Sequence, residues 1–376
     1  MSISRIYQNL NDFLEPNKVL VIFGPRQAGK TTLIKNFLAQ TSLKYRSETG
    51  DNLEIAQLLS SLNFKEILKF AEGFELIVID EAQRIKNIGQ ALKILVDNIS
   101  GIKIIVTGSS SFELAGQIGE PLTGRKINLS LYPISQLELK MDINEYDLKK
   151  NLDQYLVYGG YPAVLTKEMV GKKIETIKEI TNSYLLKDIV ELDKVKNSKV
   201  LLDLLRLLAF QVGSEVSLSE LGRQLGIDYK TVARYLDLFE KSFVIYNLRG
   251  YSRNLRKEVT KKSKYYFFDN GVLNAIINNF NSLEMREDVG RLWENFIFME
   301  RLKKRSYQNI FGNDYFWRTW DGKEIDLVEE RDGKLFGYEF KFSSKKKAKA
   351  PTTWLETYSN ASWELINSDN YLDFVV

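Results

Sequence analysis

The segment from Gly24 to Thr31 (GPRQAGKT) matches the pattern Gly-x4-Gly-Lys-[Ser/Thr] of a phosphate-binding loop. Its glycines let backbone N–H groups approach phosphate oxygens, and a helix beginning at Lys30 adds a partial positive charge. In such a loop the lysine contacts the β- and γ-phosphates, and the following hydroxyl ligates magnesium. The segment predicts a site for ATP and Mg²⁺ formed by Gly24, Pro25, Arg26, Gln27, Ala28, Gly29, Lys30, Thr31 and Thr32, with Thr31 as a metal ligand.

An acidic pair, Asp80-Glu81, directly follows the apolar run Leu76–Ile79. If this run is a strand, it delivers Asp80 to the carboxyl edge of a sheet, where ligands of such folds bind. We expect Asp80 to hold the magnesium through water and Glu81 to orient and deprotonate the attacking water. The chain has no histidine, so a histidine base is excluded. The less specific alternative is an acidic helix N-terminus after a strand.

Two further roles in phosphoryl transfer have candidates. The next apolar run ends near Thr107 and Ser109, either of which could sense the γ-phosphate through a hydrogen bond. Phosphoryl transfer usually also requires an arginine that stabilises the charge of the transition state. Arg125, in Leu-Thr-Gly-Arg-Lys, is the first candidate for this catalytic arginine, and Arg26 in the loop is the second. Either arginine could instead form a surface ion pair.

A second set of charged residues lies near the C-terminus, in Glu324-Ile-Asp326 and in Glu339-Phe-Lys341. The dipeptide Asp332-Gly333 between them is typical of a two-residue hairpin turn. Such a hairpin places Asp326 opposite Glu339 and Glu324 opposite Lys341, and all four share one face because strand side chains alternate. Two facing carboxylates repel each other, so a divalent cation, Lys341 or a proton on one acid has to compensate.

The composition excludes several kinds of chemistry and bounds the architecture. The chain has no cysteine and no histidine, which rules out disulfides, thiolate nucleophiles and the usual zinc sites. Its 376 residues exceed the size of a single core, so we expect two or three domains. No stretch approaches the roughly 20 apolar residues of a membrane span, and the first residues lack an export-signal pattern. We expect a cytoplasmic protein without a membrane partner.

Three continuously apolar runs precede the polar groups near the N-terminus: Val19–Phe23, Leu76–Ile79 and Ile102–Val106. Helical stretches separate these runs, which is typical of a parallel sheet buried on both faces. We therefore predict an α/β nucleotide-binding domain over residues 1–135. Helical periodicity continues over residues 136–211, which we interpret as a lid or linker.

A helix-turn-helix is predicted within residues 212–263. A capped helix starting at Ser217 is followed by Gly226 and by a second helix that begins near Asp228. The apolar strand Phe243–Leu248 could begin a wing, which would make the region a winged helix-turn-helix.

Basic residues gather after this strand, with Glu258 as the one acid among them: Arg249, Arg253, Arg256, Lys257, Lys261, Lys262 and Lys264. This segment could contact phosphates, while Tyr229, Lys230 and Arg234 on the second helix could reach a DNA groove. The net charge of +4 is by itself a weak nucleic-acid signal. The alternative is a solvated basic loop that docks on an acidic surface of the nucleotide-binding domain.

The segments GPRQAGKTTL, LIVIDEAQ, VTGSSS, LTGRKINLSLYPIS and YGGYP resemble the AAA-type ATPases of bacteria and archaea that carry an appended C-terminal domain of unknown function. The later segments ENFIFMERL, EID and YEFKFS resemble that appended domain. The resemblance implies an α/β P-loop NTPase (AAA-like) domain with an ATP site. It leaves the biological substrate open.

Residues 264–376 are predicted to form a separate α/β domain, and their acidic hairpin resembles the PD-(D/E)xK nuclease superfamily, which has a restriction-endonuclease-like fold. Glu294, in Leu-Trp-Glu-Asn, is similar to the additional helical acid of that superfamily. The resemblance implies that Glu294, Asp326 and Glu339 bind magnesium and that Lys341 positions the attacking water. Ile325 stands where the superfamily usually has proline, which makes the match less specific.

Two hypotheses follow. In the first, ATP and ADP control a switch that acts on or with nucleic acid, DNA above all, through a winged helix and a nuclease-like domain. In the second, the chain is a nucleotide-gated regulatory or partner-binding protein whose nuclease-like domain is catalytically silent. A homo-oligomer or a protein partner is compatible with both hypotheses, since an arginine supplied by a neighbouring subunit would require one.

Overall fold

The computed structural model describes residues 3–108, 119–185, 198–252, 263–319, 321–345 and 348–376. The chain forms two compact units, which we describe separately. The N-terminal unit consists of Arg5–Pro133 with Lys241–Phe243, and the C-terminal unit consists of Met1–Ser4, Ile134–Glu240 and Val244–Val376.

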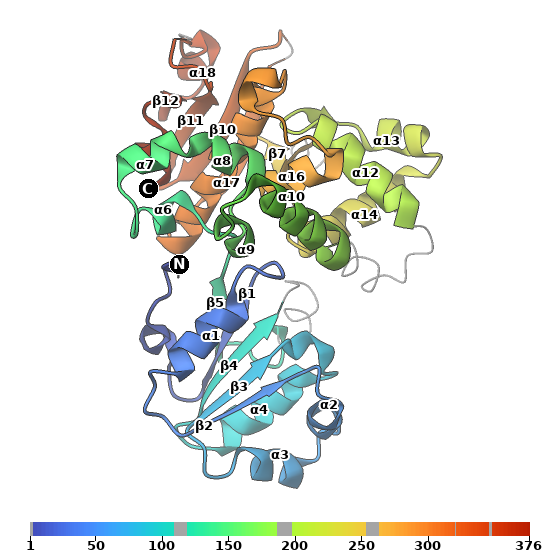
Figure 1. Cartoon of the computed structure of the whole chain (residues 1–376), viewed down its shortest axis with the longest axis vertical. Helices are drawn as coiled ribbons and strands as arrows, with labels where there is room; N and C mark the ends of the chain where they lie inside the picture. Colours follow the sequence, from blue (N-terminus) through green and yellow to red (C-terminus); the bar gives the residue numbers. More distant parts are fainter. Residues whose placement is uncertain (1–2, 109–118, 186–197, 253–262, 320, 346–347) are drawn as a thin grey trace. The chain divides into compact units, whose positions relative to one another are not determined.

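The N-terminal unit is built on five parallel strands in the order β2-β3-β4-β1-β5 (Figure 1). The strands are β1 (Lys18–Phe23), β2 (Tyr45–Thr49), β3 (Leu76–Asp80), β4 (Lys103–Gly108) and β5 (Lys126–Ser130). The helices are η1 (Leu10–Phe13), α1 (Lys30–Leu38), α2 (Leu53–Ser60), α3 (Phe64–Ala71), η2 (Ala82–Arg84) and α4 (Ile88–Asn98).

The three central strands are the ones that the apolar runs predict. Nearly all side chains of β1, β3 and β4 are buried, as expected for strands covered on both faces. The predicted α/β class with a parallel sheet is thus confirmed. The edge strands β2 and β5 are mixed in polarity and partly exposed, so they carry no continuous apolar run and were not predicted.

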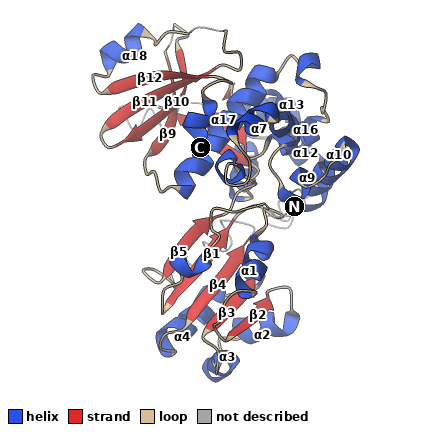
Figure 2. Cartoon of the chain, turned by 60° about the vertical axis from the view of Figure 1, so that its left-hand side comes forward, coloured by secondary structure: helices blue, strands red, loops and turns tan. Residues whose placement is uncertain are grey.

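The C-terminal unit contains one mixed sheet of seven strands in the order β12-β11-β10-β9-β7-β8-β6. Its strands β12, β11, β10 and β9 are labelled in Figure 2. The strands are β6 (Glu215–Val216), β7 (Ile245–Gly250), β8 (Ser263–Phe267), β9 (Asn313–Arg318), β10 (Glu324–Arg331), β11 (Lys334–Phe340) and β12 (Ala361–Ile366). Because β7 pairs with β9, strands from both sides of the predicted domain boundary at residues 263 and 264 share this sheet.

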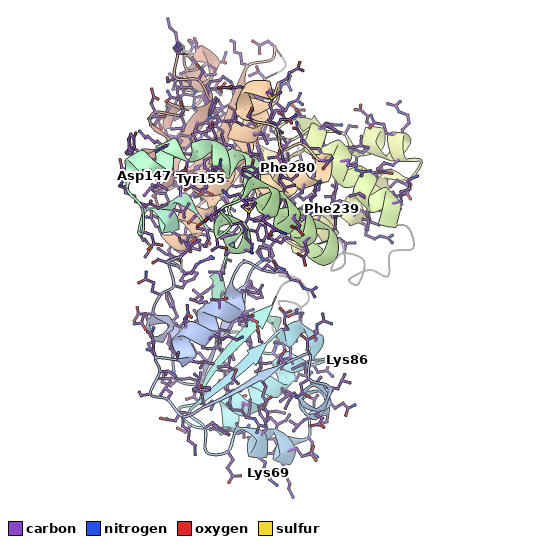
Figure 3. All side chains as sticks on the ribbon, in the orientation of Figure 1. Lys69, Lys86, Asp147, Tyr155, Phe239 and Phe280 are labelled. Carbon is purple, nitrogen blue, oxygen red and sulfur yellow. The ribbon has the colours of Figure 1, made fainter. Side chains whose placement is uncertain are left out.

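Helices make up most of the rest of this unit. They are α6 (Gln136–Leu139), α7 (Glu145–Lys150), α8 (Leu152–Tyr158), α9 (Pro162–Leu165), α10 (Val170–Glu179), η3 (Ile180–Leu185), α12 (Ser198–Phe210), α13 (Leu218–Leu225), α14 (Tyr229–Lys241), α16 (Asn270–Ile277), η4 (Leu283–Met285), α17 (Val289–Tyr307), α18 (Thr352–Thr357) and α19 (Tyr371–Val375). Phe280, which is labelled in Figure 3, stacks on Tyr158 of α8, with ring centroids 6.2 Å apart.

The predicted helix-turn-helix elements appear as α13 and α14. The Ser217 side chain accepts a hydrogen bond from the Glu220 N–H, and Gly226 ends α13 with a φ of 67°. Phe243, predicted to start the next strand, has a φ of 55° and therefore lies in a turn, so β7 starts two residues later, at Ile245. Whether these elements bind nucleic acid stays a prediction.

The hairpin of β10 and β11 has the predicted turn. Asp332 and Gly333 have φ values of 52° and 70°, as a two-residue turn of this kind requires. Leu327 pairs with Tyr338 in the expected register. Beyond that pair the ladder ends, and the Phe340 N–H instead donates to Asp326 Oδ2 at 2.8 Å.

Candidate functional site

The phosphate-binding loop joins β1 to α1 and has a backbone that only glycine allows at its first position. Gly24 has a φ of 152°, and a Cβ atom there would lie 1.9 Å from the carbonyl oxygen of Leu131. Gly29 has a φ of 101° and precedes α1. Gly29 offers no side chain to cap the first turn of α1, where phosphate-binding loops present backbone N–H groups to a ligand.

Lys30 lies against this loop and is only 5% exposed. Its ammonium donates hydrogen bonds to the carbonyl oxygens of Gly24, at 2.7 Å, and Pro25, at 2.9 Å. Arg5, which the sequence analysis missed, donates to the carbonyl oxygens of Ala28, at 2.8 Å, and Tyr132, at 2.7 Å. Arg5 thus ties the loop to the segment after β5.

The two predicted magnesium ligands near the loop meet directly. Thr31, in the first turn of α1, donates from Oγ1 to Asp80 Oδ2 at 2.7 Å, and Asp80 is the last residue of β3. The Thr107 hydroxyl, from β4, donates to Asp80 Oδ1. A hydroxyl and a carboxylate at the carboxyl edge of a parallel sheet fit magnesium, which prefers oxygen ligands and keeps several waters.

Glu81 is held in an unusual backbone conformation just beyond β3. Its φ is 50°, and its N–H donates to Thr107 Oγ1 at 3.0 Å. Its carboxylate accepts a hydrogen bond of 2.5 Å from Nε2 of Gln83. A Cβ atom on Gly50 would lie 2.4 Å from the Glu81 carbonyl oxygen, so the turn after β2 packs on this residue. Gln83 was not predicted, although its position two residues after Glu81 could have suggested it.

Three of the remaining residues predicted to contact the nucleotide lie in the described part of the chain, and one lies outside it. Arg26 is half-buried in the loop, Gln27 has a φ of 59°, and Thr32 is exposed on α1. Ser109 lies outside the described residues, so its contact with the γ-phosphate stays a prediction.

Arg125 does not approach the phosphate loop of its own chain. Lys126 pairs with Val19 near the start of β1, whereas the loop follows the end of that strand, roughly 20 Å away at about 3.3 Å per residue. The Arg125 guanidinium forms an ion pair of 2.8 Å with Asp97 on α4. The alternative of a surface ion pair is therefore the one observed for Arg125, and a catalytic role of Arg26 stays a prediction.

The acidic residues predicted near the C-terminus gather in the C-terminal unit around a lysine. Lys264 of β8 is 1% exposed, and its ammonium pairs with Glu324 and lies 3.7 Å from Glu294 and 4.0 Å from Asp326. Glu324 was expected to face Lys341 but pairs with Lys264 instead. Lys264 was expected in the exposed basic segment, and its burial corrects that expectation.

Other donors complete this Lys264 cluster, which we define as Lys264, Tyr266, Glu294, Glu324, Asp326, Glu339 and Lys341. The Tyr266 hydroxyl donates to Glu294 at 2.8 Å, and the Lys341 ammonium lies 2.6 Å from Glu339. Lys341 thus compensates the charge of Glu339, which was one of the three predicted possibilities.

Burial shifts the pKa values of the cluster. Burial, strengthened by the charge of Asp326, raises the pKa of Glu294 to about 8. Burial also raises the pKa values of Asp326 and Glu339. For Lys264, burial lowers the pKa, but the surrounding carboxylates outweigh burial and hold it above its ordinary value.

The cluster does not fit the predicted metal site. Within the ranges that the structure describes, no three acidic side chains are arranged so that they could hold a metal ion. The ammonium of Lys264 lies among the carboxylates instead. The geometry thus gives no support to magnesium binding by Glu294, Asp326 and Glu339.

The residues expected to contact nucleic acid are placed in part. Tyr229 is 53% exposed, and Lys230 and Arg234 are exposed on α14. Arg249 is exposed on β7, while residues 253–262, which carry the other basic side chains of that segment except Lys264, lie outside the described residues. In the part of the chain that is described, no helix is long and apolar enough to span a membrane.

Three family models match consecutive parts of the chain. Residues 16–140 match an AAA domain, residues 149–283 match a domain of unknown function (DUF8612), and residues 289–370 match another domain of unknown function (DUF4143). These matches support an AAA-type ATPase domain followed by a C-terminal domain of unknown function, and they support ATP binding and hydrolysis as a class of activity.

Relatives match most of the length of this chain. An uncharacterized protein of Mycobacterium tuberculosis is 28% identical over 329 residues, which are 87% of this chain and 70% of the relative. An uncharacterized protein of Methanocaldococcus jannaschii is 28% identical over 338 residues, 84% of this chain and 73% of the relative. The structure of a Walker-type ATPase of Pyrococcus abyssi is 15% identical, covering 69% of this chain and 91% of its own, with a TM-score of 0.48.

Proposed function

We propose that the chain is a magnesium-dependent ATPase whose N-terminal unit binds and hydrolyses ATP. The observation that carries this proposal is the hydrogen bond of 2.7 Å between Thr31 Oγ1 and Asp80 Oδ2. It brings the last residue of β3 to the first turn after the phosphate-binding loop. Two sequence motifs separated by almost fifty residues thus form one constellation, which a chance match of either motif would not produce.

Each residue of this constellation has a role that follows from its position. The loop from Gly24 to Thr32 binds phosphate oxygens through backbone N–H groups, and Lys30 exchanges its bonds to loop carbonyls for bonds to phosphates. Thr31 and Asp80 hold magnesium, which neutralises phosphate charge when bound. Glu81 accepts a proton from the attacking water once its carboxylate leaves Gln83.

The proposal is tested with paired substitutions in the full chain. Lys30→Ala should lose ATP binding, and Glu81→Gln should bind ATP with near-normal affinity but turn it over at least about a hundredfold more slowly. Lys35→Ala is the matched control, because Lys35 is an exposed lysine of the same helix. Binding is measured with a fluorescent ATP analogue and turnover by phosphate release. Normal turnover in Glu81→Gln would remove Glu81 from the role of base.

The C-terminal unit is proposed to transmit the nucleotide state to a partner, with DNA as the first candidate. The exposed side chains of Tyr229, Lys230 and Arg234 on α14 support a DNA contact. The Lys264 cluster favours a regulatory or partner-binding role over metal-dependent cleavage, because the ammonium of Lys264 lies among the acids that would bind the metal.

DNA binding is tested by fluorescence anisotropy as a function of salt concentration. The double variant Lys230→Ala/Arg234→Ala should bind less tightly and lower the slope of log K against log salt by about 2, because each substitution leaves one phosphate without its cation. Lys199→Ala/Arg206→Ala, on α12, is the control of equal charge. Affinity that does not depend on salt in the unsubstituted chain would instead favour a protein partner.

A further inference from the structure

The Lys264 cluster has a cation as a fixed part of its structure. The lysine side chain is 2% exposed, and its ammonium pairs with Glu324, with Glu294 and Asp326 also within 4.0 Å. The same ammonium lies 5.3 Å from the ring centroid of Phe316, which adds a cation–π contact. Three acidic side chains and an aromatic face thus surround one positive charge.

The backbone around Lys264 is paired on both sides. Lys264 pairs with Leu248 of β7 and with Glu215 of β6, so β8 is an inner strand of the sheet at this residue. The lysine side chain therefore starts from a fixed point and cannot leave the cluster without breaking strand pairs or exposing a buried ion. A lysine on a loop would have no such restraint.

The acids of the cluster also have their own donors. The Tyr266 hydroxyl donates to Glu294, the Phe340 N–H donates to Asp326, and the Lys341 ammonium pairs with Glu339. A metal ion would have to displace several of these donors as well as Lys264. A buried charge is stable only when hydrogen bonds or opposite charges offset the loss of its hydration. These contacts therefore stabilise the buried acids without a metal ion.

We propose that Lys264 is a built-in cation which replaces a divalent metal in this cluster, so that the C-terminal unit takes up neither magnesium nor manganese there. A divalent ion coordinated by Asp326 and Glu294 would lie within a few ångströms of the Lys264 ammonium. Repulsion between two such charges is strong in a region shielded from water. The cluster then holds β8, β10 and α17 together instead of activating water. This inference does not depend on ATP hydrolysis by the N-terminal unit.

Terbium(III) is a direct probe, because it binds oxygen ligands of the kind that magnesium and calcium use, and nearby aromatic side chains sensitise its emission. Tyr266 lies within the cluster and serves as such a sensitiser. The measurement uses the full chain with Asp80→Asn, which removes the carboxylate of the ATP site. We expect the same terbium emission with and without a second substitution, Asp326→Asn. A saturable emission that Asp326→Asn abolishes would overturn the proposal.

Replacement of the lysine gives the complementary measurement. In the Asp80→Asn chain, Lys264→Met should create a saturable terbium site in the cluster, which the chain with Lys264 lacks, and Asp326→Asn should then remove it. Lys264→Arg keeps the charge and should create no site. A folded Lys264→Met chain without terbium binding would show that Lys264 is not what excludes the metal. Circular dichroism shows whether each variant is folded. If Lys264→Met does not fold, the proposal is tested by the terbium emission of the Asp80→Asn chain with and without Asp326→Asn.

Discussion

At the scale of single residues, buried charges in this chain are accompanied by specific partners. Glu329 on β10 is fully buried, and its carboxylate accepts hydrogen bonds from Arg301, at 2.7 and 3.0 Å, and from Arg331, at 3.0 Å. Burial raises the pKa of Glu329, but the hydrogen bonds and charges of the arginines outweigh burial and hold it below its ordinary value of 4.5.

This lowered pKa predicts a pH dependence of stability. Because the folded chain holds the Glu329 proton less tightly than the unfolded chain, the contribution of Glu329 to stability is present above about pH 4.5. It is lost as the pH falls below that value and through the lower pKa of the folded state. Glu329→Gln should lower the free energy of unfolding at pH 7 by about 3–5 kcal/mol, since it breaks a buried ion pair.

Urea denaturation of the two chains from about pH 7 down to about pH 3 measures the effect, and the difference between them should shrink as the pH falls. Glu330→Gln is the control, because Glu330 is the next residue of β10 and is only half-buried. A difference that stayed constant with pH would mean that the charge of Glu329 does not stabilise the fold.

At the scale of elements, the sequence predicts the strands and turns that neighbouring residues determine. It does not predict the contacts that depend on pairing between strands far apart in the chain. The runs before Asp80 and Thr107 became buried central strands, and the turn at Asp332-Gly333 fixed the hairpin register. The distance of Arg125 from the loop of its own chain was not foreseen, because β5 was not recognised. A residue just before a parallel strand lies at the amino edge of the sheet, opposite the edge where the loop lies.

The Lys264 cluster could not be predicted for a related reason. Lys264 and Glu324 are 60 residues apart, and only the shared seven-stranded sheet brings their strands together. From its neighbours in the chain, Lys264 resembles the last residue of an exposed basic segment. Its alternation with Tyr266 in an apolar strand was the one local sign that the lysine side chain points toward a buried partner.

The turn after β2 offers a prediction about Glu81. Gly50 donates its N–H to the Asp80 carbonyl oxygen at 2.8 Å, and a Cβ on Gly50 would meet the Glu81 carbonyl oxygen. Gly50→Ala should therefore displace Glu81 and lower ATP turnover about tenfold, a change of about 1.4 kcal/mol in the barrier, with little change in ATP binding. Gly119→Ala, where a Cβ meets none of the described residues within 4 Å, should have no effect on turnover. Equal turnover in both variants would contradict the proposed tie between the turn and Glu81.

At the scale of the whole molecule, the C-terminal unit is continuous across the boundary that the sequence suggested. The strands β6, β7 and β8 precede α17, yet they extend the sheet formed by β9 to β12. The cross-boundary pairs include Arg249 with Tyr315 between β7 and β9, and Leu248 with Lys264 between β7 and β8. We infer that residues 264–376 are not an independent folding unit.

Expression of two fragments checks this inference. A fragment of residues 264–376 lacks β6 and β7, which leaves both edges of β8 unpaired, and it should show no cooperative thermal transition. A fragment of residues 134–376 keeps the whole sheet and should unfold cooperatively. Circular dichroism during heating distinguishes the two. A cooperative transition in the shorter fragment would restore the boundary between residues 263 and 264.

The pairing of β7 with β9 also has a consequence for synthesis on the ribosome. Arg249 pairs with Tyr315, roughly 65 residues later in the chain, so one edge of β7 has no partner strand when it emerges. At a synthesis rate of about 5–20 residues per second, that edge waits roughly 3 to 13 seconds for β9. Unpaired strand edges promote aggregation, so the yield of soluble chain should depend on how quickly translation passes through this interval.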